Sequence, residues 1–476
     1  MSQLEELLAV WLPRQRWFSG KGIAIRSIRV ESRHTLLSAG PDGPDLNLLV
    51  VEAGQRGQTS RYQVMLGSRP PRTLPADLAS TAIGVCQVSG GRPQVIYDAA
   101  HDALLTELLL ERFAAPSTFG RSEVRFRTLP GEPLRTGTHG RLLTGEQSNT
   151  SLVFGEDYIL KTFRRLWPGP NPDLELNMAL SGSPYVARPC GWIEADLPGA
   201  PTPTTLAMLQ TFIPNATDGW VLATADVGAL FDGFGGGGES AFVEDAARLG
   251  RTTAEVHRSL TRTLPTGELS PSGIAELADA MIERLATASA EVPELAEHAP
   301  RVMAAYTDFA RTAEPLPIQR VHGDYHLGQV IRTGSEWVLL DFEGEPTVPV
   351  QDRQQLASPL RDVAGMLRSF DYAAGYLLVG HPGNTALERA ARSWAGHNRD
   401  AFCRGYAEAG GIDPDKHLTA LRAFEFDKAV YEVLYEARNR PHWLRVPLES
   451  IATATAPLSE GHLSTTPFIT STTEPY

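Results

Sequence analysis

Two short segments in the second half of the chain carry the side chains that phosphoryl transfer needs. The first, residues 322–329, is a polar run after an apolar stretch and reads His-Gly-Asp-Tyr-His-Leu-Gly-Gln. The second, residues 339–345, begins apolar and ends in the acids Asp341, Glu343 and Glu345. A strand that delivers a carboxylate at its end fixes a metal ion or a catalytic base on a rigid element.

Phosphoryl transfer gives a role to each member of this set. One carboxylate accepts the proton of the attacking hydroxyl, and Asp324 suits that role. Mg²⁺ prefers hard oxygen ligands, which Asp341 and Gln329 supply. Lys161 lies in an apolar, strand-like stretch, where an unpaired ammonium is costly. We therefore expect Lys161 to contact the phosphates and to pair with Glu175 in the following helix.

The same residues leave two other classes of function open. His322 and His326 are spaced four apart, and with Asp324 and Asp341 they form a ligand set for a metal-dependent hydrolase. However, the segment lacks the Glu of a His-Glu-x-x-His motif, and Gly323 is unfavourable in a helix. We therefore expect both imidazoles to form hydrogen bonds that stiffen the loop. A non-catalytic sugar- or nucleotide-binding module is the third hypothesis, and the intact set of charged residues weighs against it.

The elements that must position these residues change in type along the chain. The first 130 residues read as short strands, interrupted by helices at residues 3–11 and 102–113. Further strands are predicted between residues 142 and 210, with a helix at 173–181 among them. The chain is then mainly helical to about residue 435, except for a strand-rich stretch at 320–342. Strands followed by helices indicate an α+β chain with two unequal lobes.

The composition of the chain argues against some classes of binding partner. The chain has 476 residues, with 43 Lys and Arg against 56 Asp and Glu, and its formal charge is −13. This acidic balance argues against a nucleic acid as partner. Its three cysteines form no CxxC pair, the N-terminus is acidic, and no apolar run approaches the length of a membrane span. We therefore expect a cytoplasmic protein with no membrane partner; the sequence does not indicate its oligomeric state.

Two low-complexity segments receive structural interpretations only. The glycine run at residues 235–238 is not followed by Lys-Ser or Lys-Thr, so we interpret it as a surface loop and not as a phosphate-binding P-loop. Residues 456–476 are rich in Ser and Thr, and we expect a disordered tail there.

The motifs taken together resemble the maltokinase-like branch of the aminoglycoside-phosphotransferase-type kinases. The resemblance extends over about residues 5–450, with Gln329 where the wider superfamily usually has Asn. The matching motifs are residues 322–329, the Asp-Phe-Glu-Gly-Glu-Pro run at 341–346, and residues 11–18, 212–220, 358–370 and 431–441.

The resemblance implies a bilobal, protein-kinase-like (aminoglycoside phosphotransferase-like) fold with an N-terminal cap domain. It implies a cap at residues 1–130, an N-lobe at 131–212 and a helical C-lobe at 213–455, with ATP and Mg²⁺ between the lobes. It assigns Asp324 as the base, Gln329 and Asp341 as Mg²⁺ ligands, and Lys161 as the phosphate contact. The remaining ATP contacts that it implies are Ser148 in the phosphate loop and Gln210 and Phe212 near the adenine.

The acceptor is a small free sugar in this family. Maltokinases phosphorylate maltose at the anomeric hydroxyl, and actinobacterial relatives phosphorylate glucosamine at the 6-hydroxyl. An ammonium favours carboxylates, but both branches carry the same acids, so charge does not decide between them. The run at residues 442–450 is more similar to the glucosamine branch, so we expect glucosamine, with maltose as the alternative. Substrate contacts are expected from Asp324, His326, Glu343, Glu345 and Arg438.

Overall fold

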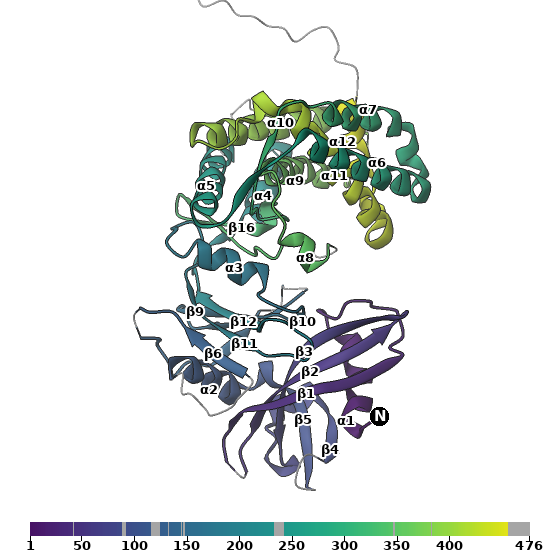
Figure 1. The fold of residues 1–476 in the computed structure, drawn as a ribbon. Coiled ribbons are helices and arrows are strands. Elements are labelled where there is room, and N and C mark those ends of the chain that lie inside the picture. Colours follow the sequence, from purple (N-terminus) through teal and green to yellow (C-terminus); the bar gives the residue numbers. More distant parts are fainter. Residues whose placement is uncertain are drawn as a thin grey trace, which may run out of the picture.

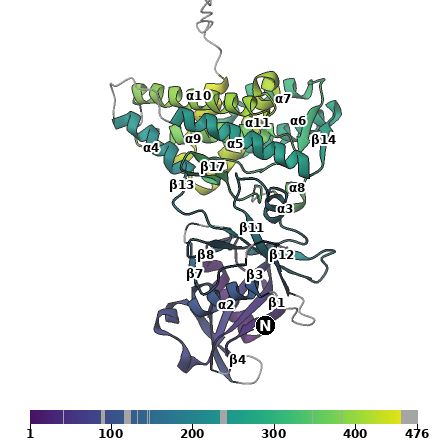
Figure 2. The same cartoon turned by 90° about the vertical axis from the view of Figure 1, so that its left-hand side faces the viewer.

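The chain folds into two β-sheets at one end and a lobe of helices at the other (Figure 1; Figure 2). The computed structural model describes residues 1–455 except 41, 88–91, 116–123, 132, 144, 146–147, 233–241, 346–347 and 382. The glycine run at 235–238 and the tail at 456–476 lie outside the described residues. The order of the elements, with strands first and helices afterwards, confirms the expected α+β class.

The first sheet is an antiparallel cap, drawn in purple in Figure 1. Its strands run in the spatial order β1-β2-β3-β5-β4, and helix α1 (Gln3–Trp11), which has the expected bounds, packs on β1 and β4. The strands are β1 (Ser27–Ser38), β2 (Asp45–Gln55), β3 (Gln58–Arg69), β4 (Ala82–Gln87) and β5 (Pro93–Asp98). Six consecutive residues of β2 are buried, because its two faces pack against different apolar clusters.

The second sheet has the order β6-β11-β12-β9-β8-β7. Helix α2 (Ala103–Ala114) packs on β6 and β7, the two edge strands of this sheet. Helix α3 (Pro172–Ala179) faces the helical lobe. The strands are β6 (Val124–Thr128), β7 (Gly140–Leu142), β8 (Thr150–Phe154), β9 (Tyr158–Thr162), β11 (Pro189–Ala195) and β12 (Thr204–Thr211). The division expected at residue 130 would separate β6 from the partner strand to which it is hydrogen-bonded, so we propose a boundary nearer residue 102.

A short link joins the two sheets. Strand β10 (Arg165–Leu166) follows β9 and pairs with β3 of the cap. Next to it, Arg164 is buried, lies 4.8 Å from the ring of Trp17 and donates to the Thr150 hydroxyl at 2.7 Å. The cap is therefore fastened to the segment that directly follows the strand carrying Lys161.

The helical lobe packs around one large apolar cluster. One three-stranded sheet and one strand pair interrupt it, and the loop between residues 320 and 330 joins the two. The helices are α4 (Gly219–Asp232), α5 (Phe242–Thr263), α6 (Pro271–Glu291), α7 (Ala299–Ala310), α8 (Val350–Arg353), α9 (Leu360–Leu378), α10 (Thr385–Glu408), α11 (Leu418–Asn439) and α12 (Arg445–Thr455). The strands are β13 (Thr217–Asp218), β14 (Thr266–Leu269), β15 (Leu316–Gln319), β16 (Val330–Thr333) and β17 (Glu336–Leu339). Within the described ranges, no helix combines the length and apolar character that crossing a membrane requires.

Candidate active site

Lys161 lies on the central strand β9 of the second sheet and points into a cavity of about 630 Å³ between this sheet and the helical lobe. Its side chain is one-tenth exposed, and its ammonium contacts Asp173 at 2.8 Å, Asp341 at 2.6 Å and Glu343 at 2.7 Å. Three carboxylates compensate the cost of burying the ammonium. The expectation that Lys161 is paired is thus confirmed, but with different partners.

The prediction that Glu175 is the partner of Lys161 is wrong. Glu175 pairs instead with the buried guanidinium of Arg320 at 3.0 Å. Asp173 and Glu175 are two residues apart on α3, and residues at that spacing face different sides of a helix. Asp173 points toward Lys161 because it also accepts from the backbone N–H of Phe342, at 2.9 Å, and from the amide of Asn177. Asp173 therefore joins the second sheet to the segment that carries Asp341.

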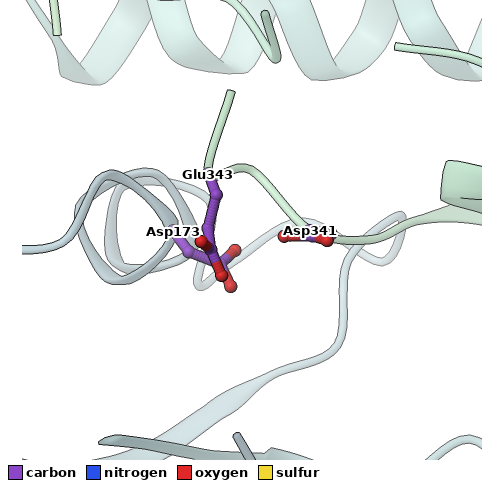
Figure 3. A group of neighbouring side chains, drawn as sticks. All are labelled: Asp173, Asp341 and Glu343. Carbon is purple, nitrogen blue, oxygen red and sulfur yellow. The ribbon is translucent and has the colours of Figure 1, made fainter. Parts of the chain in front are cut away.

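Asp173, Asp341 and Glu343 converge from α3 and from the segment after β17 (Figure 3). Each offers an oxygen, and these oxygens all lie within 4.8 Å of one another. Burial raises the pKa of Glu343 to about 7, and the charges of Asp341 and Asp173 add to that shift against the pull of Lys161. Burial also opposes ionisation of Asp341, but Lys161 outweighs it and lowers the pKa of Asp341.

The donor chemistry of this cluster fits Mg²⁺. Carboxylate and amide oxygens are the hard ligands that Mg²⁺ prefers, and Gln329 lines the same cavity as Asp341 and Glu343. Asp341 has a backbone φ of 61°, a left-handed conformation that is costly for a residue with a side chain. Asp173 is almost fully buried and already held by three donors, so Asp341, Gln329 and Glu343 are the residues that could hold the ion.

Asp324 lies in the loop between β15 and β16, and a buried carboxylate on α9 holds that loop. Asp362 accepts from the backbone N–H of His322 at 2.7 Å and from that of Gly323 at 2.9 Å. Its oxygen also accepts from the imidazole of His257, 3.0 Å away. Gly323 has a φ of 83°, a conformation that glycine adopts without strain. The loop is therefore fixed by charge-assisted hydrogen bonds to a helix distant in sequence.

The two histidines of the loop stiffen it, as expected. The imidazole of His322 donates through Nε2 to the carbonyl of Leu340 at 2.8 Å, and its Nδ1 accepts weakly from the N–H of Asp324 at 3.4 Å. The Nδ1 atom of His326 accepts from the backbone N–H of Gly328 at 3.1 Å. Because both ring nitrogens of His322 are occupied, His322 does not offer a metal ligand. Burial, reinforced by the charges of Lys428 and His322, lowers the pKa of His326 despite Asp324 nearby.

Lys428 on α11 contacts Asp324, a contact that sequence reasoning missed. Its ammonium donates to Oδ1 of Asp324 at 3.1 Å. Burial opposes ionisation of Asp324, but the charge of Lys428, helped by His326, outweighs it and lowers the pKa of Asp324. One signal was available in the sequence: the chain has only four lysines, and it otherwise uses arginine as its cation. Two of the four, Lys161 and Lys428, are the ones that contact these carboxylates.

Two further cavities lie beside Lys428 in the helical lobe. One, of about 340 Å³, is bordered by His326 and by the side chains of α9 and α11; we call it the aromatic cavity. The other, of about 330 Å³, includes Glu345 and lies between α6 and α11. The aromatic cavity is lined by Trp220, Tyr372, Tyr431, Tyr435 and Trp443, with Glu432, Glu436 and Arg440 among its polar residues.

Most of the remaining predicted site residues lie in the cavity of Lys161. Ser148, Gln210 and Phe212 line the cavity of Lys161 together with Asp324. Glu343 lies there too and accepts from the amide of Asn149 at 2.5 Å, so it is on the Lys161 side and not beside the aromatic cavity. Three residues received no role from the sequence, although Asp362 lies in the matching motif at 358–370. Asp173, Asn149 and Asp362 contact partners that are 12, 194 and 40 residues away.

Arg438 does not reach any of these cavities, so the substrate role expected for it is wrong. Its guanidinium forms a surface ion pair with Glu291 of α6 at 2.5 Å, and its side chain is more than half exposed. Two residues further on, Arg440 lines the aromatic cavity and binds Glu436. The helix ends between them, and this change of backbone direction separates their side chains.

Comparison with known proteins gives consistent matches in sequence and in structure. Residues 11–102 match the family model described as the maltokinase N-terminal cap domain, and residues 139–411, more than half of the chain, match that of the phosphotransferase enzyme family. The chain is 30% identical over 327 residues to the glucosamine kinase of Streptacidiphilus jiangxiensis, covering 66% of this chain and 72% of that one. It is 29% identical over 322 residues to the glucosamine kinase of Mycolicibacterium smegmatis (strain ATCC 700084 / mc(2)155), covering 66% and 79%.

The solved structures agree in fold. A structure described as glucosamine kinase in complex with glucosamine, ADP and inorganic phosphate superposes with a TM-score of 0.65 at 24% identity, covering 94% of this chain and 98% of that one. A second crystal form of a glucosamine kinase gives a TM-score of 0.67 at the same identity and coverage. The expected kinase-like fold with an N-terminal cap is thereby confirmed.

Proposed function

The chain belongs to the phosphotransferase enzyme family and carries a maltokinase-type cap, and from this premise we propose that it transfers phosphate from ATP to glucosamine, giving glucosamine 6-phosphate. It is a sugar kinase with an alcohol group as acceptor, as its relatives are. The relatives named glucosamine kinase favour an amino sugar. Maltose, with maltose 1-phosphate as product, is the alternative that the cap-domain match favours.

One observation carries the proposal. Asp324 lines the cavity that holds Lys161 and Asp341, and the ammonium that it contacts, Lys428, lines the aromatic cavity. A carboxylate between these two cavities is placed to accept a proton from a hydroxyl entering from one of them while phosphate arrives from the other. The lowered pKa of Asp324 keeps it ionised and therefore able to accept that proton.

The nucleotide side of the proposal rests on the cavity of about 630 Å³. Lys161 contacts the phosphates, and the backbone near Gln210 and Phe212 meets the adenine. Asp341, Gln329 and Glu343 are the residues that would hold Mg²⁺, which when bound would neutralise phosphate charge. The ammonium of Lys161 lies among these carboxylates, at 2.6 Å from Asp341.

The acceptor side rests on the lining of the aromatic cavity. Aromatic faces suit the apolar faces of a sugar ring, and carboxylates accept from its hydroxyls. Glu436 is buried, with Oε1 accepting from the Tyr372 hydroxyl at 2.7 Å. Glu432 is held by the buried guanidinium of Arg368 at 2.5 Å. These two glutamates are the groups that we expect to bind an ammonium.

In the proposed reaction, the aromatic cavity, Asp324 and Lys161 each have one task. The aromatic cavity orients the sugar so that one hydroxyl lies against Asp324. The hydroxyl oxygen forms a bond to the γ-phosphorus as the bond to the β,γ-bridging oxygen breaks, and Asp324 takes the hydroxyl proton. Lys161 stabilises the charge on the phosphates. Positioning and charge neutralisation supply most of the rate gain.

The test is ADP release against a panel of free sugars that includes glucosamine, maltose and glucose. The proposal expects the highest kcat/KM with glucosamine, and preference for maltose would establish the alternative. The Asp324→Asn variant should lose turnover and still bind ATP by calorimetry. Silence of the wild type across the panel, or near-normal turnover of Asp324→Asn, would contradict the proposal.

A further inference from the structure

Lys428 lies beside Asp324, on the side from which we expect the acceptor sugar to approach. Its ammonium contacts Oδ1 of Asp324 at 3.1 Å, and within the described part of the chain no hydrogen bond reaches Oδ2. The side chain is about one-quarter exposed, lies over the ring of Tyr431 at 4.9 Å and borders the aromatic cavity and the cavity that includes Glu345. The oxygen left for a sugar hydroxyl therefore belongs to the same carboxylate that the ammonium of Lys428 contacts.

The charges along α11 change sign with distance from Asp324. Lys428, Glu432 and Glu436 follow one another at four-residue spacing and all line the aromatic cavity. Residues at that spacing lie on one face of a helix, about 6 Å apart along its axis. The aromatic cavity thus has a cation beside the base and carboxylates one and two turns away. Glu432 is paired with Arg368, and Glu436 with Arg440, whose side chain is 43% exposed.

We propose that Lys428 is a specificity-determining residue that selects the hydroxyl of an amino sugar to be phosphorylated, an inference that rests on the function proposed above. A hydroxyl on a carbon next to the amine-bearing carbon would bring the substrate ammonium close to Lys428, where like charges repel. A hydroxyl across the ring reaches Asp324 with the ammonium directed toward Glu432 and Glu436. For a 2-amino hexose, the disfavoured hydroxyls are those at positions 1 and 3, and the primary 6-hydroxyl is favoured.

Other charges around this pair do not reverse the effect. Asp324, Glu345 and Glu432 face Lys428 from the loop, from the segment after β17 and from α11, and keep it protonated. His326 and His322 face Asp324 from its own loop. A substrate ammonium next to Asp324 would therefore meet a carboxylate whose cation is held in place, whereas the side chain of Arg440 is 43% exposed and can turn away from Glu436.

The experiment compares glucosamine with glucose, which has the same hydroxyls and no amine. Dissociation constants for both sugars are measured by calorimetry with ADP present, in the wild type and in Lys428→Met, Lys428→Arg and Lys21→Met. Lys21 is an exposed lysine of the cap and serves as the matched control. Wild-type products are examined by NMR for the position of the phosphate.

Removing the charge should strengthen glucosamine binding relative to glucose by about threefold or more in Lys428→Met, because repulsion is lost. The ratio should stay at the wild-type value in Lys428→Arg, which keeps the charge, and in Lys21→Met. The wild-type product should carry phosphate away from the amine. A ratio that is unchanged in Lys428→Met, or a wild-type product phosphorylated at position 1 or 3, would overturn the role of Lys428. Absence of turnover of any sugar by the wild type would instead contradict the proposed function, and the binding ratio would still test Lys428.

Discussion

Replacing Asp173 with asparagine tests which acid of α3 serves Lys161. The substitution keeps the size of the side chain and an oxygen that can accept from the N–H of Phe342, so the local backbone should stay in place. It removes the charge of one of the three carboxyl groups around the ammonium of Lys161. The matched control is Glu175→Gln, two residues away on the same helix, which removes a charge that contacts Arg320 instead.

The size of the effect follows from the contact that is lost. A hydrogen bond to a charged group contributes about 1.5–3 kcal/mol, and about 1.4 kcal/mol corresponds to a tenfold change in rate. We therefore expect kcat/KM for ATP to fall by about 10- to 100-fold in Asp173→Asn. The carboxylate of Glu175 is one-third exposed and does not touch Lys161, so Glu175→Gln should change kcat/KM by less than about threefold.

The assay is steady-state ADP release with ATP varied at saturating sugar, supported by thermal unfolding of each variant. Equal unfolding midpoints would show that a difference in rate does not come from loss of fold. A larger effect of Glu175→Gln than of Asp173→Asn would refute the assignment, because Glu175 would then be the functional partner of Lys161.

Three other outcomes follow from the geometry. Asp362→Asn weakens the hydrogen bonds that hold the Asp324 loop, so it should lower the free energy of unfolding, measured in urea, by about 2–4 kcal/mol. For the same reason it should reduce kcat more than it changes KM for ATP. In metal-free protein, the raised pKa of Glu343 (about 7) means that the folded state binds more protons than the unfolded state between pH 4.5 and 7, so stability should fall as pH rises through that window. Glu343→Gln should flatten this decline in a series of melting temperatures, and an unchanged slope would contradict the origin given for it. Arg438→Ala, which removes only a surface ion pair with Glu291, should leave kcat/KM for the sugar within about twofold.

Much of the cavity that holds Lys161 could be predicted, because several of its residues are close together in sequence. Asp324 and Gln329 lie in the loop before the β16–β17 hairpin, and Asp341 follows that hairpin, so local folding brings them to one edge. The apolar residues around Lys161 predicted a central strand, and β9 has two neighbouring strands. The buried lysine needed a carboxylate partner for the same reason, because an unpaired ammonium inside a sheet is costly.

The tertiary structure alone decided which charges meet. Asp173 and Glu175 are equally acidic and two residues apart, and the packing of α3 against the segment after β17 selects Asp173. Arg438 and Arg440 look alike in sequence, yet the end of α11 sends them to different surroundings. Lys428 reaches Asp324 across 104 residues of sequence, a contact that no local pattern encodes. Residue types and short spacings therefore determined the chemistry available to this protein, whereas pairing over long range depends on how helices and sheets pack, which is set by the whole buried surface and not by any one motif.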